Sequence, residues 1–305
     1  MTLQPNPSVP ALPRSNVVVA EWKITFLALV FLATFLRCAD ANAGTLTVGL
    51  GADYATGTYG EPNKTIDWYV PVSLAYKTGN WRAKLVVPYV SVEGNGEVLG
   101  SREDRTVDDR RGRNRGTGNS GGEDDDDDDA EDAATIAAGG SVTTRHSGLG
   151  DTSFSLTYSA IADDASGWFV DLTLRTKFGT ASEADGLGTG KHDYGVSLDL
   201  DKDIGRATLS LSLGYTVVGE PEGFDYRNVV SGSTGLSYRF TDAVSANTYV
   251  SYRQSVRAGA PAQLDVSPGL SFRLSSGHRV NTYVLFGLDD GSPDFGAGLA
   301  YSLAF

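Results

Sequence analysis

The sequence predicts an all-β fold: a single-chain, antiparallel transmembrane β-barrel of about 12 strands with one long, disordered acidic loop. Three observations predict it. After residue 43, apolar residues alternate with small or polar ones, the predicted strands are even in number, and the connections alternate between short and long. Neighbouring side chains of a strand face opposite sides of a sheet. Bacterial outer-membrane barrels combine an even strand number with short periplasmic turns and longer extracellular loops.

Residues 1–43 are expected to be a cleaved signal peptide. The apolar run 24–36 is shorter than the ~20 residues that a membrane-spanning helix needs. Arg14 and Lys23 precede the run, and Ala41-Asn42-Ala43 follows it as a small-x-small cleavage pattern. The alternative is a short membrane anchor. Residues 44–305 form the predicted barrel domain.

Composition limits the function classes. The 305 residues hold 25 Lys and Arg against 38 Asp and Glu, a formal net charge of -13. Nucleic acid is therefore not expected as a partner, since phosphates are bound by clustered cations. The single Cys excludes a disulfide scaffold.

The period of two is clearest in the strand predicted at 207–218. One face carries Leu209, Leu211, Leu213, Tyr215 and Val217, and the other carries Thr208, Ser210, Ser212, Gly214 and Thr216. Equivalent runs place strands near 45–54, 67–77, 81–92, 150–160, 168–179, 193–202, 207–218, 229–240, 244–255, 264–275, 279–288 and 295–305. Short connections fall at 78–80, 161–167, 203–206, 241–243 and 276–278, and the intervening connections are mostly longer.

Aromatic residues on the apolar face gather near both predicted strand ends, for example Trp68 and Tyr215 at one and Trp81 and Trp168 at the other. Two such belts are typical of a barrel whose outer face contacts outer-membrane lipid. A soluble β-sandwich, the alternative, would bury its aromatic residues in the middle of its strands.

The last strand alternates up to a terminal Phe, with Leu299, Tyr301, Leu303 and Phe305 on one face. This pattern resembles the signal by which the barrel-assembly machinery recognises outer-membrane barrels for insertion.

Residues 93–149 form the predicted long extracellular loop. Asp124–Asp129 is a run of six aspartates, and dense charge with little hydrophobicity predicts disorder. One interpretation is weak capture of divalent cations by these carboxylates. A solvated surface loop is the alternative, and the sequence favours it because the spaced ligands of a calcium loop are absent.

Charged residues recur on the inward face, and both signs are present. The lumen candidates are Asp151, Asp171, Arg175, Lys177, Asp193, Asp199, Arg239, Arg253 and Arg273. Because buried charges are costly in a dry core, the lumen is expected to be wet or ion-paired. These residues would either line a selective channel or plug a narrow barrel through cross-strand pairs.

No catalytic or cofactor-binding motif is recognised. His146, His192 and His278 are the only histidines, and two are expected in loops and one at a turn. There is no Gly-x-Ser-x-Gly elbow and no metal-ligand cluster. We therefore expect no catalytic residues, no metal and no cofactor.

Residues 148–196 carry a family resemblance. Gly148-Leu-Gly-Asp151, Lys177-Phe-Gly-Thr180, Gly186-Leu-Gly-Thr-Gly190 and Asp193-Tyr-Gly-Val196 follow one another in a characteristic order. This order resembles an outer-membrane family named for the meta-pathway of phenol degradation, although Gly179 stands where a Pro is common. The match covers roughly 148–305. The resemblance implies a passive transporter for small, including aromatic or hydrophobic, solutes.

The glycines of this signature, Gly148, Gly150, Gly186, Gly188 and Gly190, are expected to give the backbone freedom at the barrel rim. Asp151 and Asp193 would point inward, close to Lys177. They would either clasp the rim or contact a solute.

We therefore predict a passive channel in the bacterial outer membrane whose partner is a small-molecule solute. A structural or adhesive surface barrel that uses the acidic loop is the first alternative. An outer-membrane lipid hydrolase, which would need one of the three histidines, is the second.

Overall fold

A computed structural model of the chain describes residues 44–60, 63–94, 144–221, 223–275 and 277–305. The predicted signal peptide and the aspartate run Asp124–Asp129 lie outside the described residues. Within the described ranges, no helix has the length and apolar character needed to cross a membrane. Residues Thr45–Phe305 form one compact unit, in which every regular element is a strand.

The thirteen strands follow the predicted pattern closely. They are β1 (Thr45–Gly57), β2 (Thr65–Thr78), β3 (Trp81–Gly94), β4 (Thr144–Leu149), β5 (Thr152–Asp163), β6 (Trp168–Phe178), β7 (Asp193–Ile204), β8 (Ala207–Val217), β9 (Val229–Arg239), β10 (Val244–Arg253), β11 (Gln263–Ser275), β12 (His278–Gly287) and β13 (Phe295–Ala304).

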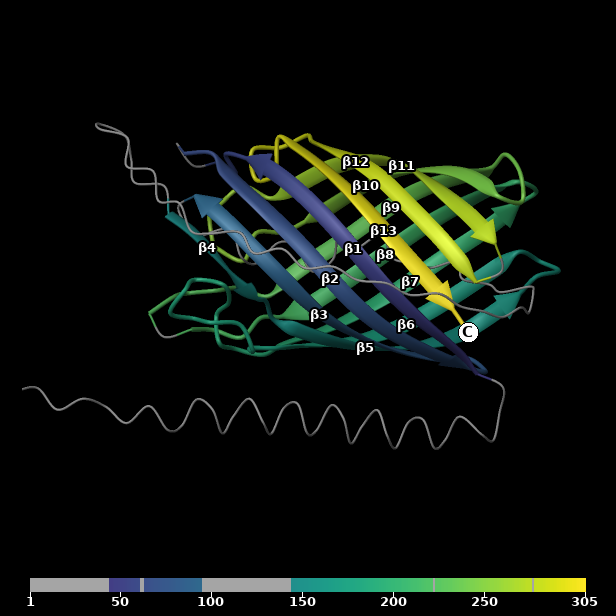
Figure 1. Cartoon of the computed structure of the whole chain (residues 1–305), viewed down its shortest axis with the longest axis horizontal. Coiled ribbons are helices and arrows are strands. Elements are labelled where there is room, and N and C mark those ends of the chain that lie inside the picture. Colours follow the sequence, from purple (N-terminus) through teal and green to yellow (C-terminus); the bar gives the residue numbers. More distant parts are fainter. Residues whose placement is uncertain (1–43, 61–62, 95–143, 222, 276) are drawn as a thin grey trace, which may run out of the picture. The chain divides into compact units, whose positions relative to one another are not determined.

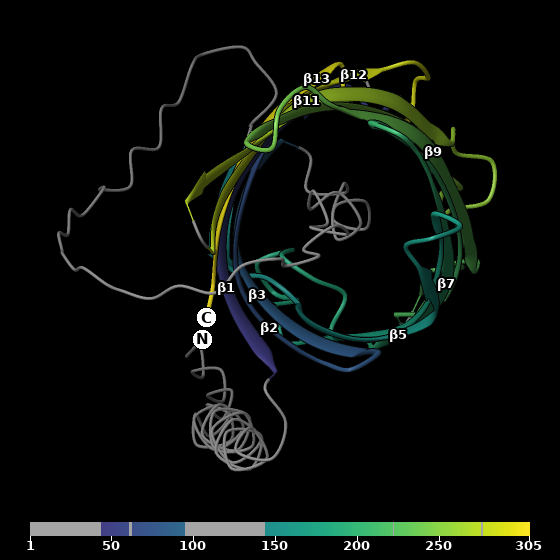
Figure 2. The same cartoon turned by 90° about the vertical axis from the view of Figure 1, so that its right-hand side faces the viewer.

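All neighbouring strands are antiparallel, and the sheet closes on itself (Figures 1 and 2). β1 pairs with β2 on one side and with the last strand, β13, on the other. The closure continues to the chain end, where the Phe305 N–H donates to the Leu46 carbonyl over 2.7 Å. A closed barrel satisfies every strand edge, which lipid could not do. The predicted barrel is thereby confirmed.

The prediction of one structureless segment over 93–149 is wrong at its edges. β3 extends to Gly94, and β4 occupies Thr144–Leu149. β4 pairs with the C-terminal half of β3, and β5 pairs with its N-terminal half. β4 and β5 thus share one of twelve barrel positions. Thr144–Leu149 shows no apolar alternation, so its sequence does not predict a strand. Backbone pairing with β3 stabilises the strand instead.

The ladder between β3 and β4–β5 is interrupted beside Pro88. Proline has no N–H to donate, but its carbonyl accepts a hydrogen bond from the Gly150 N–H over 2.9 Å. Gly150 and Asp151 lie between β4 and β5, so Asp151 is not part of the strand ladder. Its side chain is nearly buried and turns toward the loop after β6.

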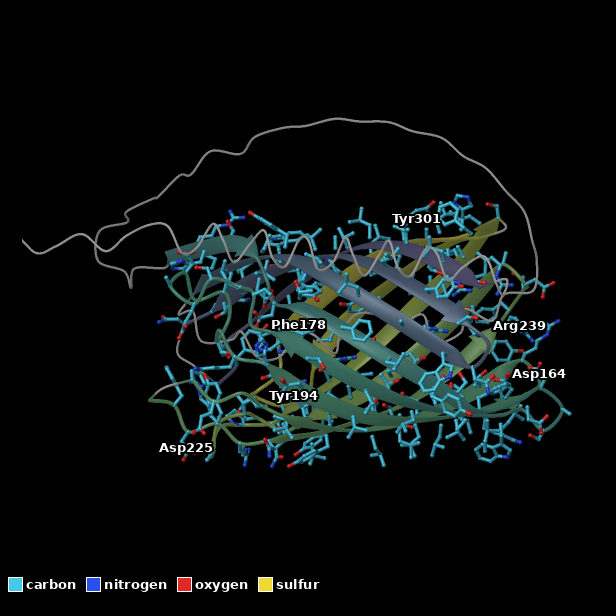
Figure 3. The ribbon with its side chains drawn as sticks, turned by 90° about the horizontal axis from the view of Figure 1, so that it is seen from below. Asp164, Phe178, Tyr194, Asp225, Arg239 and Tyr301 are labelled. Carbon is cyan, nitrogen blue, oxygen red and sulfur yellow. The ribbon has the colours of Figure 1, made fainter. Side chains whose placement is uncertain are left out.

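The connections alternate in length as predicted. At one end of the barrel, short turns join β2–β3, β5–β6, β7–β8, β9–β10 and β11–β12, and β1 begins and β13 ends there. Figure 3 shows Asp164 and Arg239 at this short-turn end and Asp225 in a loop at the opposite, long-loop end. This arrangement matches periplasmic turns and extracellular loops.

The outer face is apolar and exposed. On β8, Leu209, Leu211, Leu213, Tyr215 and Val217 are all 44–55% exposed, whereas Thr208 and Ser212 on the other face are buried. Soluble proteins do not leave continuous apolar surface of this kind in water. Lipid is therefore the medium of this face.

Aromatic rings pair on this face near both ends. Tyr54 and Trp68 lie 5.1 Å apart between ring centroids near the long-loop end. Trp81 and Tyr158 lie 4.7 Å apart near the short turns. These pairs belong to the two belts that the sequence predicts, at the depth of the lipid headgroups.

The inner face is not polar throughout. Tyr69 of β2 and Val90 of β3 are buried against Ala181 and Leu187, which belong to the loop between β6 and β7. These four residues form a buried hydrophobic cluster on the inner face. Through this cluster, residues 179–192 pack against the inner face of β2 and β3.

Candidate functional site

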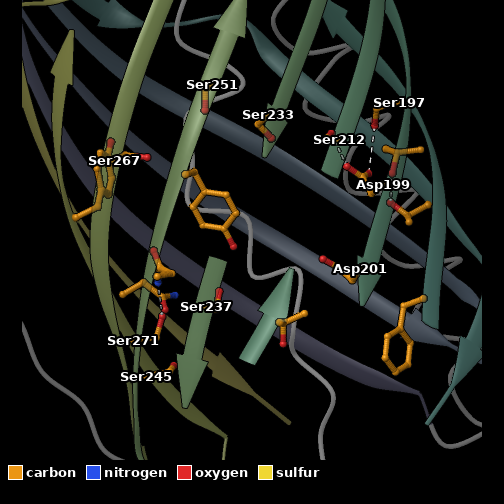
Figure 4. A pocket seen from close by; sticks show the side chains of 18 of the residues that line it. Ser197, Asp199, Asp201, Ser212, Ser233, Ser237, Ser245, Ser251, Ser267 and Ser271 are labelled. Atoms are coloured by element: carbon orange, nitrogen blue, oxygen red, sulfur yellow. Dashed lines mark hydrogen bonds between the residues drawn. The ribbon is translucent and has the colours of Figure 1, made fainter. Parts of the chain in front are cut away.

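The lumen contains a cavity of about 1200 Å³ lined by residues of β2, β3 and β5–β12 and of the turns between them. Most of the lining side chains are polar, and Figure 4 shows serines projecting into the cavity from several strands. The basic lining residues are Arg82, Lys84, Arg175, Arg206, Arg239, Arg253, Arg273 and Arg279. The acidic ones are Asp164, Asp199, Asp201, Asp203, Asp242 and Asp265. Charged and hydroxyl-bearing side chains of this kind suit contact with water better than a dry core.

Three carboxylates stand on one strand of this lining. Asp199, Asp201 and Asp203 alternate along β7 and face the lumen (Figure 4 labels the first two). Each accepts a hydrogen bond from the hydroxyl of its register partner on β8. The donors are Ser212 to Asp199 over 2.6 Å, Ser210 to Asp201 over 2.5 Å and Thr208 to Asp203 over 2.5 Å. These bonds hold the acidic row against the wall.

Basic side chains gather elsewhere in the lumen, near the short turns. Arg273 of β11 and Arg279 of β12 are direct register partners, and both line the cavity. Arg82 of β3 lines the same cavity. We call Arg82, Arg273 and Arg279 the arginine cluster.

The arginine cluster spans the part of the wall that carries the smallest inward residues. β13, β1 and β2 lie between β12 and β3, and the inward positions of β13 and β1 include Gly49, Gly51, Ala300 and Ser302. β7 stands six strand positions from β13 in either direction around the ring. The acidic row thus faces the small-residue wall that the arginines flank.

Two tyrosines lie flat along the wall inside the lumen. Tyr249 pairs in register with Gly235, and a Cβ atom on that glycine would be 2.2 Å from the tyrosine ring. Tyr283 covers Gly298 in the same way, and its hydroxyl donates to Asp53 over 2.6 Å. Glycine is needed at both positions because the rings occupy the space of a side chain.

At the long-loop end, charges of opposite sign meet. Lys177 of β6 lies 3.2 Å from Asp151 and 2.9 Å from Asp193 of β7, measured from Nζ to carboxylate oxygens. The three side chains are only 7–16% exposed. The Thr180 and Ala181 N–H groups donate to Asp151 over 3.0 and 2.9 Å, and the Gly219 N–H donates to Asp193 over 2.8 Å. We call Asp151, Lys177 and Asp193 the rim triad.

The rim triad holds residues 179–192 in place, and glycines permit the close packing. A Cβ atom on Gly188 would lie 2.7 Å from the Ala181 Cβ and 3.0 Å from Asp151. One on Gly148 would lie 2.9 Å from Leu187. Gly186 and Gly190 have positive φ angles of 66° and 64°, which favour glycine. The five signature glycines thus serve two needs, close approach and left-handed turns.

The predicted lumen residues separate into groups. Arg175, Asp199, Arg239, Arg253 and Arg273 line the cavity. Asp151, Lys177 and Asp193 meet at the rim instead. Asp171 of β6 is not among the cavity-lining residues and lies in register with Asp199. The residues of the predicted insertion signal face outward on β13, with Leu299 at 52% and Phe305 at 70% exposure.

Sequence reasoning missed several lumen residues. Asp201 and Asp203 share the parity of Asp199, and Tyr249 shares the parity of Arg253. The period of two would have identified all of them. Arg82 and Arg279 are placed on the inward face by the same parity, but no sequence signal brings β3 and β12 to one cavity.

The histidines do not form a common site. His146 lies on β4 and His278 begins β12, so the expectation of a loop and a turn is wrong for these two. The Gly179 N–H donates to His192 Nδ1 over 3.2 Å, and His278 Nδ1 lies 2.6 Å from the Tyr301 hydroxyl. Among the described residues, no group of three His, Cys, Asp or Glu could hold a metal ion.

The fold and sequence match known proteins. The family model described as "Putative MetA-pathway of phenol degradation" matches residues 40–305, a longer stretch than the 148–305 expected from the motifs. The crystal structure of the COG4313 outer membrane channel from Pseudomonas putida F1 is similar, with a TM-score of 0.61 and 11% identity over 87% of this chain and 96% of that one.

Two more distant structures are the NanC porin and the P. putida toluene transporter TodX. The NanC porin has a TM-score of 0.46 and 11% identity over 85% of this chain and 98% of that chain. TodX has a TM-score of 0.41 and 12% identity over 88% and 91%. No curated protein matches the sequence.

Proposed function

The chain belongs to the family described as "Putative MetA-pathway of phenol degradation", and from this premise we propose that it is a passive channel for small solutes in the bacterial outer membrane. One observation carries the proposal. A polar cavity of about 1200 Å³ lies inside a closed barrel whose outer face is apolar. A cavity of that size has room for a small aromatic molecule together with water.

Passive transport fits the chemistry of the lining. The described lining residues offer hydroxyl groups, amides and charges of both signs, which can form hydrogen bonds with water and with a passing solute. The route we propose passes the rim triad at the long-loop end, follows the serine-lined wall and leaves beside the arginine cluster. Residues 1–43 would be removed as a signal before insertion.

Planar-bilayer recording tests the proposal directly. The chain from residue 44 to 305, refolded in detergent, should insert and give discrete conductance steps that persist at low voltage. A preparation that is folded by heat-modifiability on gels, yet never conducts, would contradict the channel.

Removing the acidic segment separates the channel from the adhesive alternative. A variant that lacks residues 100–140 should keep its conductance within about twofold, because the strands on either side of that segment close the barrel and line the cavity. An adhesin would keep its fold and lose binding to its surface ligand instead. Loss of conductance in a folded deletion variant would show that the acidic segment belongs to the pathway.

A further inference from the structure

We propose that the inner wall around Tyr249 is a binding site for a neutral saccharide passing through the lumen. The proposal rests on the channel function above and names a solute class for it. The site consists of one tyrosine and four serines that all line the cavity, on three neighbouring strands: Tyr249 and Ser251 of β10, Ser233 and Ser237 of β9, and Ser267 of β11. We call these five residues the tyrosine patch.

The register of the three strands brings the tyrosine patch together. Tyr249 lies opposite Gly235 on β9 and opposite Ser267 on β11. Side chains two residues apart on a strand share a face. The two patch serines of β9 therefore flank Gly235, and Ser251 is the next inward residue after Tyr249. Figure 4 shows the four serines projecting into the same cavity.

The ring of Tyr249 presents one face to the lumen. Its other face covers Gly235, where a Cβ atom would collide with the ring. The side chain is half-buried and borders the cavity, so the uncovered face is a flat apolar surface among serine side chains. The face of an aromatic ring is electron-rich and attracts groups with a slight positive charge. The C–H bonds on the flat side of a pyranose ring are such groups.

The hydroxyl groups of the tyrosine patch are available to a solute. None of the five has a hydrogen-bond partner among the residues that the structure describes. On the adjacent strand β8, by contrast, the hydroxyls of Thr208, Ser210 and Ser212 donate to carboxylates of β7. Each hydroxyl of the patch can donate one hydrogen bond and accept others. A solute that displaces water from them must therefore bring several hydrogen-bonding groups of its own.

The same features favour a neutral sugar over an ion or a simple aromatic molecule. The nearest inward positions to Tyr249, in register and along β10, are Gly235, Ser267, Asn247 and Ser251, and all four are uncharged. An aromatic molecule such as phenol could stack on the ring, but its single hydroxyl would leave most of the patch without a partner. A pyranose carries several hydroxyl groups around a flat ring of C–H bonds, so it matches both the ring and the serines.

The test is saturation-transfer difference NMR on the folded chain from residue 44 to 305, in a detergent without a sugar headgroup. The probe is methyl β-D-glucopyranoside. Phenol offers a ring face with one hydroxyl, and sorbitol offers hydroxyls without a ring. We expect saturable binding of the glucoside and at least about fivefold weaker binding of the other two. Fivefold corresponds to about 1 kcal/mol, the net contribution of one typical hydrogen bond.

Either comparison probe can overturn the proposal. Phenol that binds as tightly as the glucoside would mean that the hydroxyls contribute nothing and that the solute is aromatic. Sorbitol that binds as tightly as the glucoside would mean that the ring of Tyr249 is not used.

Replacing the ring locates the site. Tyr249→Leu should weaken glucoside binding about fivefold or more. Tyr283→Leu is the matched control, because the ring of Tyr283 also covers a glycine inside the lumen, but its hydroxyl is bound to Asp53. The control should change the affinity by no more than about twofold. An equal loss in both variants would mean that sugar binds elsewhere in the lumen and would overturn the site.

A pair of serine variants tests the hydroxyls, and it decides the matter if Tyr249→Leu does not fold. Ser233→Ala with Ser267→Ala removes two hydroxyls of the tyrosine patch with little change in volume, and it should weaken glucoside binding about fivefold. Ser153→Ala with Ser155→Ala removes two hydroxyls that line the same cavity from β5, and it should leave the affinity within about twofold. Equal effects would contradict the proposal.

Bilayer recording of the same preparations keeps the two proposals apart. Conductance without glucoside binding would overturn the saccharide site and leave the channel intact. Saturable glucoside binding without conductance would support the site and contradict the channel. With both present, added glucoside should lower the ion current of the unaltered chain and should have about fivefold less potency on Tyr249→Leu.

Discussion

The two ends of the lumen use charged residues in opposite ways. At the long-loop end, Lys177 lies between Asp151 and Asp193, and backbone N–H groups donate to both carboxylates. At the short-turn end, Arg273 faces Arg279 across the strand pair, and Arg82 lines the same cavity. The first arrangement compensates its charges within the protein. The second places like charges together.

This difference separates structure from function. A compensated, nearly buried triad has few hydrogen-bonding atoms left for a solute, so of the two roles expected from the sequence we favour the clasp of residues 179–192. Like charges in register do not stabilise a strand pair, so we expect the pair of Arg273 and Arg279 to contribute little to the stability of the wall. The variants below test whether the rim is structural and the arginine cluster is not.

The largest effect is expected for Lys177→Met. This change keeps most of the side-chain length but leaves two nearly buried carboxylates without their shared cation. Breaking a buried ion pair by removing one partner costs about 3 kcal/mol. Urea unfolding of the barrel in lipid vesicles, followed by tryptophan fluorescence, should show a loss of that size.

Lys64→Met is the matched control, because Lys64 also forms a pair with an aspartate. Its Nζ lies 3.9 Å from Asp294, and the two side chains are 57% and 55% exposed. An exposed pair contributes below about 1 kcal/mol. Equal losses in the two variants would mean that the rim triad is an ordinary surface pair.

A smaller loss is expected for Gly179→Ala. A Cβ atom there would lie 2.3 Å from the carbonyl carbon of Gly190, so the two ends of the segment 179–192 must move apart. Overpacking of this kind costs about 2 kcal/mol, and the displaced loop should also make single-channel currents noisier. Urea unfolding measures the loss of stability, and bilayer recording measures the variance of the current.

Gly195→Ala provides the comparison for this change. Gly195 lies on β7 and faces the lumen, and the nearest atom to its added Cβ would be Thr216 Oγ1 at an ordinary 3.4 Å. We expect a change within about 0.5 kcal/mol. If Gly179→Ala changed the stability as little as Gly195→Ala, the segment 179–192 would not be tightly fixed.

The smallest effect has the opposite sign. Arg273→Gln removes one of two like charges in register, so the barrel should become more stable by roughly 0.5 kcal/mol. The gain should shrink at high salt because screening weakens the repulsion. Urea unfolding at low and high ionic strength measures it. A clear loss of stability would mean that Arg273 is part of the structural wall and would remove the contrast between the two ends.

The barrel was largely predictable because its signal is local. Leu209 to Val217 alternate with Thr208 to Thr216, and this period sets the lipid face and the lumen face of a strand whatever its neighbours are. β4 was not predicted because it lacks this local signal. Thr144–Leu149 has no alternation, and its strand form depends on pairing with β3, which lies fifty residues away across the acidic segment.

The site was predictable only in part. The motif order placed Asp151, Lys177 and Asp193 near one another, and the family resemblance supplied that information rather than the period of two. Asp171 was expected in the lumen with Asp199, yet it is not among the cavity-lining residues. Parity assigns a side of the wall to each residue, but it does not say how far a side chain reaches into the lumen.

The sequence alone determined which face of each strand meets lipid and which meets water, because a strand's side chains alternate along a single chain. Only the tertiary structure decided which charges meet inside. Closure of β1 on β13 brings β12 and β3 to the two sides of a wall of small residues, so that Arg82 and Arg279 line the same cavity. Distances across a lumen depend on the curvature and stagger of the whole ring, which no single strand encodes.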